Sequence, residues 1–407
     1  MSKTTTGAER LAVDGGTPVR TKPFPKWPVA GEREEQLLLE VLHSGDWGEI
    51  TGNKVATFAD KFAAFQGAQY GTCVPNGTMA LEMALRALGV GPGDEVITTP
   101  YTFIATASAA LGLGAKPVFV DIRPDTCNLD PARIGAAVTK RTKAIVPVHI
   151  GGQPADLDGA RDVARQYGLR VLEDACQAWG AEWRGQRVGA IGDLGTFSFQ
   201  ASKNITAGEG GIVVTNDEEL HNLCWSLHNV GRVRDGAWYQ HEILGWNFRM
   251  PEWSAAILLA QLERLPEQMA VRDAAASYLD EALADIDGVA PLAVDPRVTR
   301  HAHHLYPVRY HAAKFGGHSR ADFLAALRAE GITCAGAGYV PLTKSPAIHR
   351  SLHDLFGADA VAAITDCPVA DQAAEEVVWF TQNALLDDQD GLDTIIAAIA
   401  KIQRAWG

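Results

Sequence analysis

The sequence lacks several features that would assign it to a specialised class of protein. No apolar run approaches the roughly 20 residues that a helix needs to cross a membrane, and the first residues, MSKTTTGAERLAV, have no apolar core of a secretory signal. Basic residues are scarce: 36 Lys and Arg stand against 49 Asp and Glu, which gives a formal net charge of −13. Proteins that bind nucleic acids or anionic membranes need basic surfaces, and this acidic composition does not favour them. We therefore expect a cytoplasmic protein that binds neither nucleic acid nor a membrane.

Patterns that bind metals or form disulfides are also missing. The six cysteines are widely spaced and include no CxxC pair, which is typical of reduced, mostly buried thiols in a cytosolic protein. Histidines cluster at His301, His303 and His304, but no HExxH motif accompanies them. The sequence thus predicts no metal site. Internal repeats and low-complexity tracts are absent as well.

The sequence does contain a regular alternation of strand and helix patterns. Its 407 residues, 47% of them hydrophobic, can bury a large core and suggest about two or three domains. Strand patterns occur at residues 70–74, 95–99, 117–121, 144–149, 169–172, 196–199 and 212–215, and helical patterns at 33–43, 55–65, 79–88, 131–138, 157–167 and 218–228. Such alternation predicts the α/β class, with a mostly parallel central sheet covered by helices on both faces.

Beyond residue 250 the pattern predicts a smaller α+β domain. Two long helices, at 252–265 and 267–284, lead into strands at 306–310 and near 333 and into helices at 320–330 and 392–406. Residues 1–15 are expected to be disordered, and the proline-rich stretch up to residue 28 to lie over the body of the protein or a partner subunit. The predicted organisation is an N-terminal arm (1–30), a large α/β domain (31–265) and a small C-terminal α+β domain (266–407).

The strongest candidate for a reactive residue is Lys203, in the stretch GTFSFQASKNITAGEGG at residues 195–211. The lysine follows a strand pattern and precedes Gly208, Gly210 and Gly211. Glycines at this density mark backbone that takes unusual dihedral angles or comes close to a ligand. Partial burial would lower the pKa of the amine, and a neutral amine can form a Schiff base with an aldehyde. For this residue alone, a solvated loop lysine is the alternative.

Asp174 supplies a carboxylate, which such a reactive lysine requires as a second catalytic group. An apolar strand pattern ends in Glu173 and Asp174, which places a carboxylate at the carboxyl end of a parallel strand, where α/β sheets bind ligands. Enzymes that use pyridoxal 5′-phosphate (PLP) need an acid that keeps the pyridine nitrogen protonated and a lysine that carries the aldehyde. We expect Asp174 and Lys203 to be these two catalytic residues, with PLP as the cofactor.

A phosphate site is predicted where the first strand of the large domain turns into a helix, at PNGT (residues 75–78). The free N–H groups and positive dipole end at the start of a helix suit an anion. Gly77 would let the backbone approach the phosphate, and Thr78 offers a hydroxyl as well as its N–H group. An ordinary N-cap by Asn76 is the alternative.

Four separated stretches carry a resemblance to a known family. In order they read PNGTMALEMAL, GPGDEVITTPYTFIAT, EDACQAWGA and SFQASKNITAGEGG. Together they resemble the DegT/DnrJ/EryC1/StrS family of PLP-dependent aminotransferases, and the resemblance runs from about residue 15 to the end of the chain. It implies fold type I of the PLP enzymes, which is aspartate aminotransferase-like, and an activity on keto sugars or keto cyclitols.

The resemblance also assigns roles to further residues. It implies that Phe103 stacks on the cofactor ring, for which a buried core phenylalanine is the alternative, and that Gln177 approaches the phenolic oxygen of the ring. Ser198 would join Gly77 and Thr78 at the phosphate. In a homodimer, Asn247 of one subunit would reach the cofactor phosphate of the other, with a weaker phosphate or substrate role for Arg249.

The details of the motifs favour one class of acceptor. SFQASKN, and GRVRD ahead of GWNFRM, are more similar to aminocyclitol aminotransferases and amino-hydroxybenzoate synthases than to nucleotide-sugar enzymes, whose lysine loop more often reads SFH. The resemblance therefore favours glutamine as the donor and a scyllo-inosose-like cyclitol ketone as the acceptor, in antibiotic biosynthesis. A nucleotide-linked keto sugar with a glutamate donor is the alternative, and an amino-hydroxybenzoate synthase is less favoured.

Some positions depart from the family pattern, so the substrate contacts there can differ. Gly151 stands where relatives often have an aromatic residue, Thr343 where they have histidine, and Cys334 with Ala335 where arginine is common. A sugar dehydratase of the same fold would carry histidine in place of Lys203. A scaffold protein without catalysis would have no reason to keep both the lysine and its acid.

Overall fold

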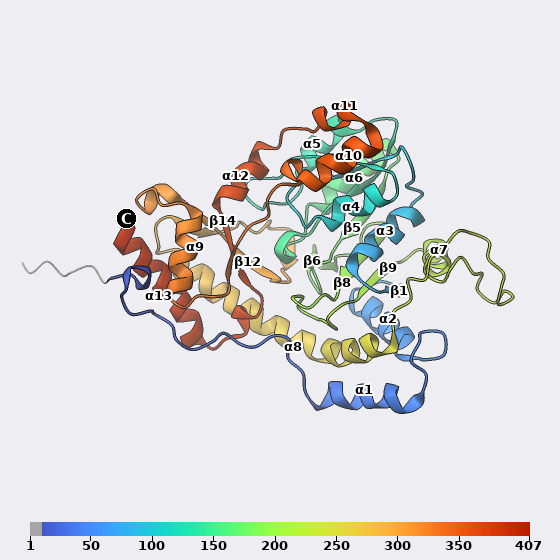
Figure 1. Cartoon of the computed structure of the whole chain (residues 1–407), viewed down its shortest axis with the longest axis horizontal. Helices are drawn as coiled ribbons and strands as arrows, with labels where there is room; N and C mark the ends of the chain where they lie inside the picture. Colours follow the sequence, from blue (N-terminus) through green and yellow to red (C-terminus); the bar gives the residue numbers. More distant parts are fainter. Residues whose placement is uncertain (1–9) are drawn as a thin grey trace, which may run out of the picture.

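A seven-stranded sheet organises the larger part of the structure, a computed structural model that describes residues 10–407 (Figure 1). In spatial order its strands are β1 (Tyr70–Val74), β9 (Gly211–Thr215), β8 (Leu194–Ser198), β5 (Arg170–Asp174), β4 (Thr142–Val146), β2 (Glu95–Thr98) and β3 (Lys116–Phe119). The strands from β8 to β3 run parallel, whereas β9 pairs antiparallel with both β1 and β8. The predicted α/β class with a mostly parallel sheet is confirmed.

Helices cover both faces of this sheet because its strands are apolar on both sides. In β9, Ile212 and Val214 pack into one buried cluster, while Val213 between them packs into another on the opposite face. The first cluster includes α2 (Lys54–Phe65) and part of α8 (Glu252–Leu283); the second includes α3 (Gly77–Ala87), α4 (Ala105–Gly112) and α7 (Glu218–His228). Farther along the sheet, α5 (Pro131–Ala137) and α6 (Leu157–Tyr167) enclose a third cluster.

A second, antiparallel sheet forms the other part of the chain (left in Figure 1). Its order is β10 (Val289–Pro291), β12 (Leu305–Tyr310), β14 (Val377–Thr381) and β13 (Ala335–Ala337), and its core includes side chains of α9 (Arg320–Ala329) and α13 (Gln389–Trp406). The helices α10 (Pro346–Phe356), α11 (Ala358–Ala362) and α12 (Pro368–Glu376) pack instead with residues of α4 and β3. A three-stranded sheet, β11 (Val298–Arg300), β6 (Glu182–Trp183) and β7 (Gln186–Arg187), completes the fold. The domain division at residue 265 stays a prediction.

The prediction of two helices around Pro266 is wrong, because α8 continues through this proline as one helix of 32 residues. Proline removes one backbone hydrogen bond and usually kinks a helix. Here both halves are buried: Leu265 and Met269 belong to the core of the large sheet, and Leu279 belongs to the core of the small one. The apolar burial on both sides of the proline keeps the helix continuous.

The described N-terminal residues pack against the part of the chain that holds the small sheet. Residues 1–9 lie outside the described residues, but the expected disorder is wrong for residues 10–15: Leu11 is buried in the core, and the N–H of Ala12 donates to Oε1 of Glu330 at 2.8 Å. Farther along the arm, Arg20 forms a buried ion pair with Asp387 at 2.7 Å. The arm then leads to α1 (Glu32–Ser44), which lies along α8 in Figure 1.

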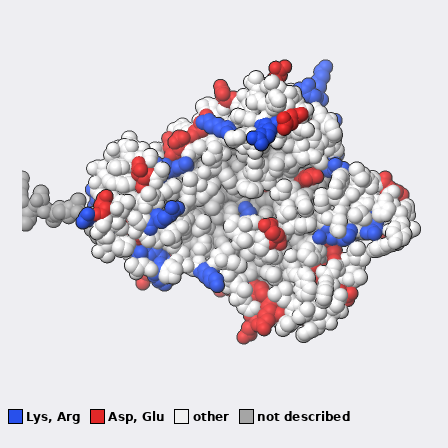
Figure 2. Space-filling model, viewed as in Figure 1, with Lys and Arg blue, Asp and Glu red and all other residues white. Residues whose placement is uncertain are grey.

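Two surface properties bear on possible partners. On the face shown in Figure 2, the basic and acidic side chains of the described residues are interspersed rather than gathered into a basic patch. Among residues 10–407, no helix has both the length and the apolar character that crossing a bilayer requires.

Candidate active site

The predicted residues, with the exception of Asn247 and Arg249, lie at one edge of the large sheet. Because β1 and β8 both run antiparallel to β9, their carboxyl ends fall at the same edge as those of β5, β4 and β2. The turns that leave this edge carry the following candidates: Gly77, Thr78, Phe103, Asp174, Gln177, Ser198 and Lys203. Ligands of α/β proteins bind at such an edge.

Lys203 lies in the turn after β8 and is partly buried. Its N–H group donates to the carbonyl of Gln200 at 2.9 Å, which holds the turn. Burial lowers the pKa of the amine below its ordinary value, and the neighbouring acidic groups of Cys176 and Asp174 oppose this lowering. A larger fraction of this amine is therefore neutral and nucleophilic at neutral pH than for a lysine in water.

The carboxylate of Asp174 is buried at the end of β5 and is held by groups on both of its oxygens. The hydroxyl of Thr106 donates to Oδ2 at 2.8 Å, and the N–H of Cys176 donates to Oδ1 at 3.2 Å. The backbone of Asp174 also pairs with β4 and its following turn, through Pro147 and His149. The sequence analysis gave no role to Thr106, which lies in the first turn of α4.

The residue before Asp174 points the other way and fixes the loop that leads into β8. Glu173 is fully buried and accepts hydrogen bonds from the N–H groups of Gly189, Ile191 and Gly192, between 2.6 and 2.8 Å. His149 Nε2 lies 3.1 Å from the same carboxylate. Successive residues of β5 thus serve two purposes, one structural and one facing the site.

The start of α3 forms a shallow cradle against the ends of β8 and β9. Asn76 caps the helix, since its Oδ1 accepts the N–H of Met79 at 2.9 Å. A Cβ at Gly77 would lie 2.8 Å from Cβ of Ser198, and a Cβ at Gly211 would lie 2.5 Å from the carbonyl of Asn76. Only glycine fits at both positions.

This cradle suits a phosphate group. The N–H groups of Gly77 and Thr78 belong to the first helical turn, where the helix itself offers them no acceptor. Thr78 is exposed, and the hydroxyl of Ser198 lies beside the space that a Gly77 side chain would fill. Backbone donors, a hydroxyl and the helix dipole therefore converge, as anion sites require.

Phe103 and Gln177, the two residues predicted to contact the cofactor ring, differ in their surroundings: the first is exposed and the second is hydrogen-bonded within the chain. Phe103 is 57% exposed in the turn before α4, so the alternative of a buried core phenylalanine is wrong. The amide of Gln177 is engaged within the chain: Oε1 accepts the N–H of Gly151 at 2.8 Å, and Nε2 donates to the hydroxyl of Tyr339 at 2.9 Å. Gln177 thereby links the turn after β4 to the segment after β13, and its contact with a cofactor stays a prediction.

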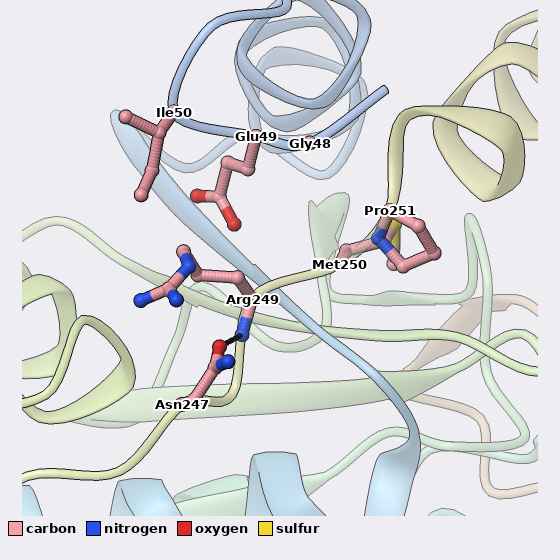
Figure 3. A pocket seen from close by; sticks show the side chains of 7 residues that line it. All are labelled: Gly48, Glu49, Ile50, Asn247, Arg249, Met250 and Pro251. Atoms are coloured by element: carbon pink, nitrogen blue, oxygen red, sulfur yellow. Dashed lines mark hydrogen bonds between the residues drawn. The ribbon is translucent and has the colours of Figure 1, made fainter. Parts of the chain in front are cut away.

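Asn247 lies in a separate cavity of about 330 Å³, whose lining residues are drawn in Figure 3: Gly48, Glu49, Ile50, Asn247, Arg249, Met250 and Pro251. Its Oδ1 accepts the N–H of Arg249 at 3.4 Å, and the side chains of Glu49 and Arg249 lie near one another in the same view. Neither Lys203 nor Asp174 lines this cavity. Within one chain, this cavity therefore does not join Asn247 to the lysine.

A contact that the sequence analysis missed joins Lys203 to the histidine cluster. His304 Nε2 lies 3.4 Å from Nζ of Lys203. The cluster drew attention only as a possible metal site, and among residues 10–407 no group of three or more His, Cys, Asp or Glu side chains is arranged to hold a metal ion. No sequence pattern would have paired two residues that are 101 positions apart.

Known proteins are similar to this chain in sequence and in fold. A sequence model of the DegT/DnrJ/EryC1/StrS aminotransferase family matches residues 28–400. A protein of Streptomyces kanamyceticus with the provisional name L-glutamine:3-amino-2,3-dideoxy-scyllo-inosose aminotransferase is 44% identical, over 97% of either chain. The L-glutamine:2-deoxy-scyllo-inosose aminotransferase of Streptoalloteichus tenebrarius is 39% identical, over 98% of either chain.

A solved structure extends this similarity to three dimensions. The crystal structure of 3-amino-5-hydroxybenzoic acid synthase superposes with a TM-score of 0.86 and is 39% identical. The match covers 94% of this chain and 99% of that one.

Proposed function

The chain belongs to the DegT/DnrJ/EryC1/StrS aminotransferase family, and we propose that it uses PLP to move the amino group of glutamine to a cyclitol ketone of the scyllo-inosose type. The observation that carries the proposal is the partly buried amine of Lys203, whose pKa lies below its ordinary value at a sheet edge that it shares with Asp174. When bound, PLP supplies an aldehyde that takes up the amino group and a ring that withdraws electrons from the reacting carbon. The remaining work falls to side chains of this protein.

Each group of the site has one task in this proposal. Nζ of Lys203 would hold the aldehyde carbon of bound PLP and, once released, would move a proton to and from the reacting carbon. Asp174 keeps a proton on the pyridine nitrogen, and the donors on its two oxygens keep the carboxylate in place. Gly77, Thr78 and Ser198 bind the phosphate, while the exposed ring of Phe103 is free to cover the cofactor from one face.

The nature of the acceptor is supported by relatives and by charge. Relatives that match this chain over almost their whole length are named for glutamine and for scyllo-inosose derivatives. A nucleotide-linked sugar carries two phosphates and calls for basic contacts. The uncharged residues Cys334, Ala335 and Thr343 stand where related enzymes often have arginine or histidine. A cyclitol without phosphate groups is therefore the better match, and a nucleotide-linked keto sugar is the second candidate.

We also propose a homodimer in which Asn247 completes the phosphate site of the partner subunit. Asn247 lies away from Lys203 in its own chain, in a cavity shared with Arg249. Large apolar side chains are exposed nearby, as with Ile50 at 49% and Leu244 at 75%. Contact with a second copy would bury them and bring the amide to a cofactor that this chain cannot reach by itself.

Two experiments test the proposal. PLP added to the purified protein should give a visible absorbance band that borohydride removes, and peptide mass spectrometry should then find the reduced cofactor on Lys203. Lys203→Ala should show neither band nor transamination, and retention of both would contradict the assignment. For the substrates, scyllo-inosose and a nucleotide keto sugar should be compared with glutamine and glutamate as donors. A preference for the nucleotide sugar would favour the second candidate.

A further inference from the structure

His304 is a buried residue that the proposed reaction does not yet use, and it contacts the reactive lysine. It stands immediately before β12, the second strand of the small sheet, whereas Lys203 follows β8 of the large one. Its Nε2 lies 3.4 Å from Nζ of Lys203. The small sheet thus places one ring nitrogen against the amine on which the chemistry depends.

The hydrogen bonds around Asn204 define which ring nitrogen of His304 carries the proton. Asn204 donates through Nδ2 to the carbonyl of Ala302 at 2.8 Å, which fixes the orientation of its amide. Its Oδ1 therefore faces Nδ1 of His304, at 3.1 Å. An amide oxygen can only accept, so Nδ1 must donate. In the neutral ring the lone pair is then on Nε2, facing Lys203.

The backbone and the packing hold the ring in this orientation. His303, the preceding residue, has a left-handed backbone with φ of 48°, which costs energy for a residue other than glycine. The N–H of Ala302 donates to the carbonyl of Gly152 at 2.9 Å, and the ring of Trp179 meets His304 edge to face with centroids 5.5 Å apart. Strain of this kind is retained where a position is needed for function.

Burial and the positive charges around the ring of His304 keep the ring neutral. Burial, then the charge of Lys203, then that of Arg272 on α8 hold the pKa of His304 well below its ordinary range. Across the amine, Asp174 and Cys176 face Lys203. His301 and His303 belong to the same segment, and burial lowers the pKa of both. A neutral histidine can accept a hydrogen bond from the lysine through Nε2.

We propose that His304, oriented by Asn204, positions the amine of Lys203 whenever that amine is free of the cofactor. Nε2 accepts one N–H of Lys203, which leaves the lone pair of the amine available on its other side to take a proton from the substrate carbon. Without this acceptor the amine would rotate freely about its last bonds. The inference rests on the proposed function, because it assigns a role within the same lysine chemistry.

The first test uses the apoprotein, so that it does not depend on transamination. Lys203 is methylated with formaldehyde and cyanoborohydride over a range of pH, and the extent is read by peptide mass spectrometry with surface lysines as internal standards. An acceptor stabilises the ammonium form more than the amine. In His304→Phe the midpoint for Lys203 should therefore fall by about one pH unit, and in His304→Gln, which keeps an acceptor, most of the shift should be absent. An unchanged midpoint in His304→Phe would overturn the proposal.

The second test uses the PLP-loaded enzyme. The rate constant of amino transfer from glutamine should fall roughly 10- to 100-fold in His304→Phe with little change in KM, and His304→Gln should recover much of it. Asn204→Asp places a carboxylate against Nδ1, raises the pKa of His304 and should move the acid limb of the pH–rate profile to higher pH. An acid limb that stays at the wild-type position would contradict the role of His304, also where His304→Phe fails to fold.

These outcomes are distinct from a failure of the proposed function. If wild-type protein bound no PLP through Lys203, the assignment of the reaction would fall. If wild-type protein did bind it and both His304 variants behaved like wild type, only the positioning role would fall.

Discussion

Gly77→Ala is the most direct perturbation of the phosphate cradle. The added methyl carbon would lie 2.8 Å from Cβ of Ser198 and 3.1 Å from Sγ of Cys176. Carbon atoms prefer about 3.5–4.0 Å, so Ser198 would have to move by roughly 1 Å. Overpacking of this kind costs about 1–3 kcal/mol, and the better helix propensity of alanine offsets about 1 kcal/mol. The expected loss of folding stability is therefore small, at most about 2 kcal/mol.

Cofactor binding should suffer more than folding does. A displaced Ser198 and a blocked Gly77 N–H group each remove a hydrogen bond to a charged phosphate, worth about 1.5–3 kcal/mol. Loss of one such bond weakens PLP binding roughly 10- to 150-fold. The measurement is a titration of apoprotein with PLP, followed by absorbance, beside a urea unfolding curve that reports stability separately.

Two matched controls make the result specific. A Cβ at Gly91 would meet no atom within 4 Å, so Gly91→Ala should bind PLP as the wild type does. Pyridoxal, which lacks the phosphate, should bind Gly77→Ala and wild type equally. If Gly77→Ala retained PLP affinity within about twofold of wild type, or if it lost pyridoxal affinity to the same extent as PLP affinity, the cradle would not be the phosphate site.

Three further predictions concern the acid, the histidine cluster and the subunit interface. Thr106→Val leaves a buried oxygen of Asp174 without its donor and should lower kcat/KM roughly 10-fold, whereas Thr106→Ser should not; equal rates for both would refute the role. Burial, Arg272 and Arg300 lower the pKa of His303 to about 4, so this histidine should contribute a loss of up to about 1.4 kcal/mol of folding stability per pH unit as pH falls from about 6.5 to 4. Urea unfolding should show a shallower slope for His303→Asn, and an equal slope would contradict this. Finally, mixing Lys203→Ala with Asn247→Ala subunits should recover about a quarter of wild-type activity if the site is shared, and none if Asn247 serves its own chain.

Local patterns were enough to predict the elements that local interactions define. The predicted ranges of β1, α6 and α7 agree with the structure at every residue. Both helices, α6 and α7, begin at an aspartate, Asp156 or Asp217, whose side chain accepts N–H groups of the first turn. Because such N-cap residues can be recognised in the sequence, the start of each helix could be predicted. In contrast, β14 was not predicted, although it lies in the middle of the small sheet. Its partner Leu305 lies far from Thr381 in the sequence, but its own residues, VVWFT, have the β-branched and aromatic composition that is typical of a strand, so a local signal was present.

The residues of the candidate site also fall into two groups: those that sequence patterns predict, and those that only the packing of the fold brings together. Lys203 and Asp174 could be predicted because strand ends of a parallel sheet meet at one edge. Their supporting groups could not: Thr106 reaches Asp174 across 68 positions, and Tyr339 reaches Gln177 across 162. These contacts depend on how helices and sheets pack, which hydrophobic periodicity alone does not specify.

The position of the small sheet is therefore part of the active-site geometry, and both α8 and direct hydrogen bonds hold it. His304 precedes β12 and Tyr339 follows β13, so both side chains reach the edge of the large sheet from the small one. The N–H of Ala302 donates to the carbonyl of Gly152, and the carbonyl of Ala302 accepts Nδ2 of Asn204, so the segment before His304 is also bound directly to turns of the large sheet. α8 adds a continuous connection between the two sheets, with Leu265 in one core and Leu279 in the other. The distance between His304 and Lys203 is therefore set by these hydrogen bonds together with a rigid helix.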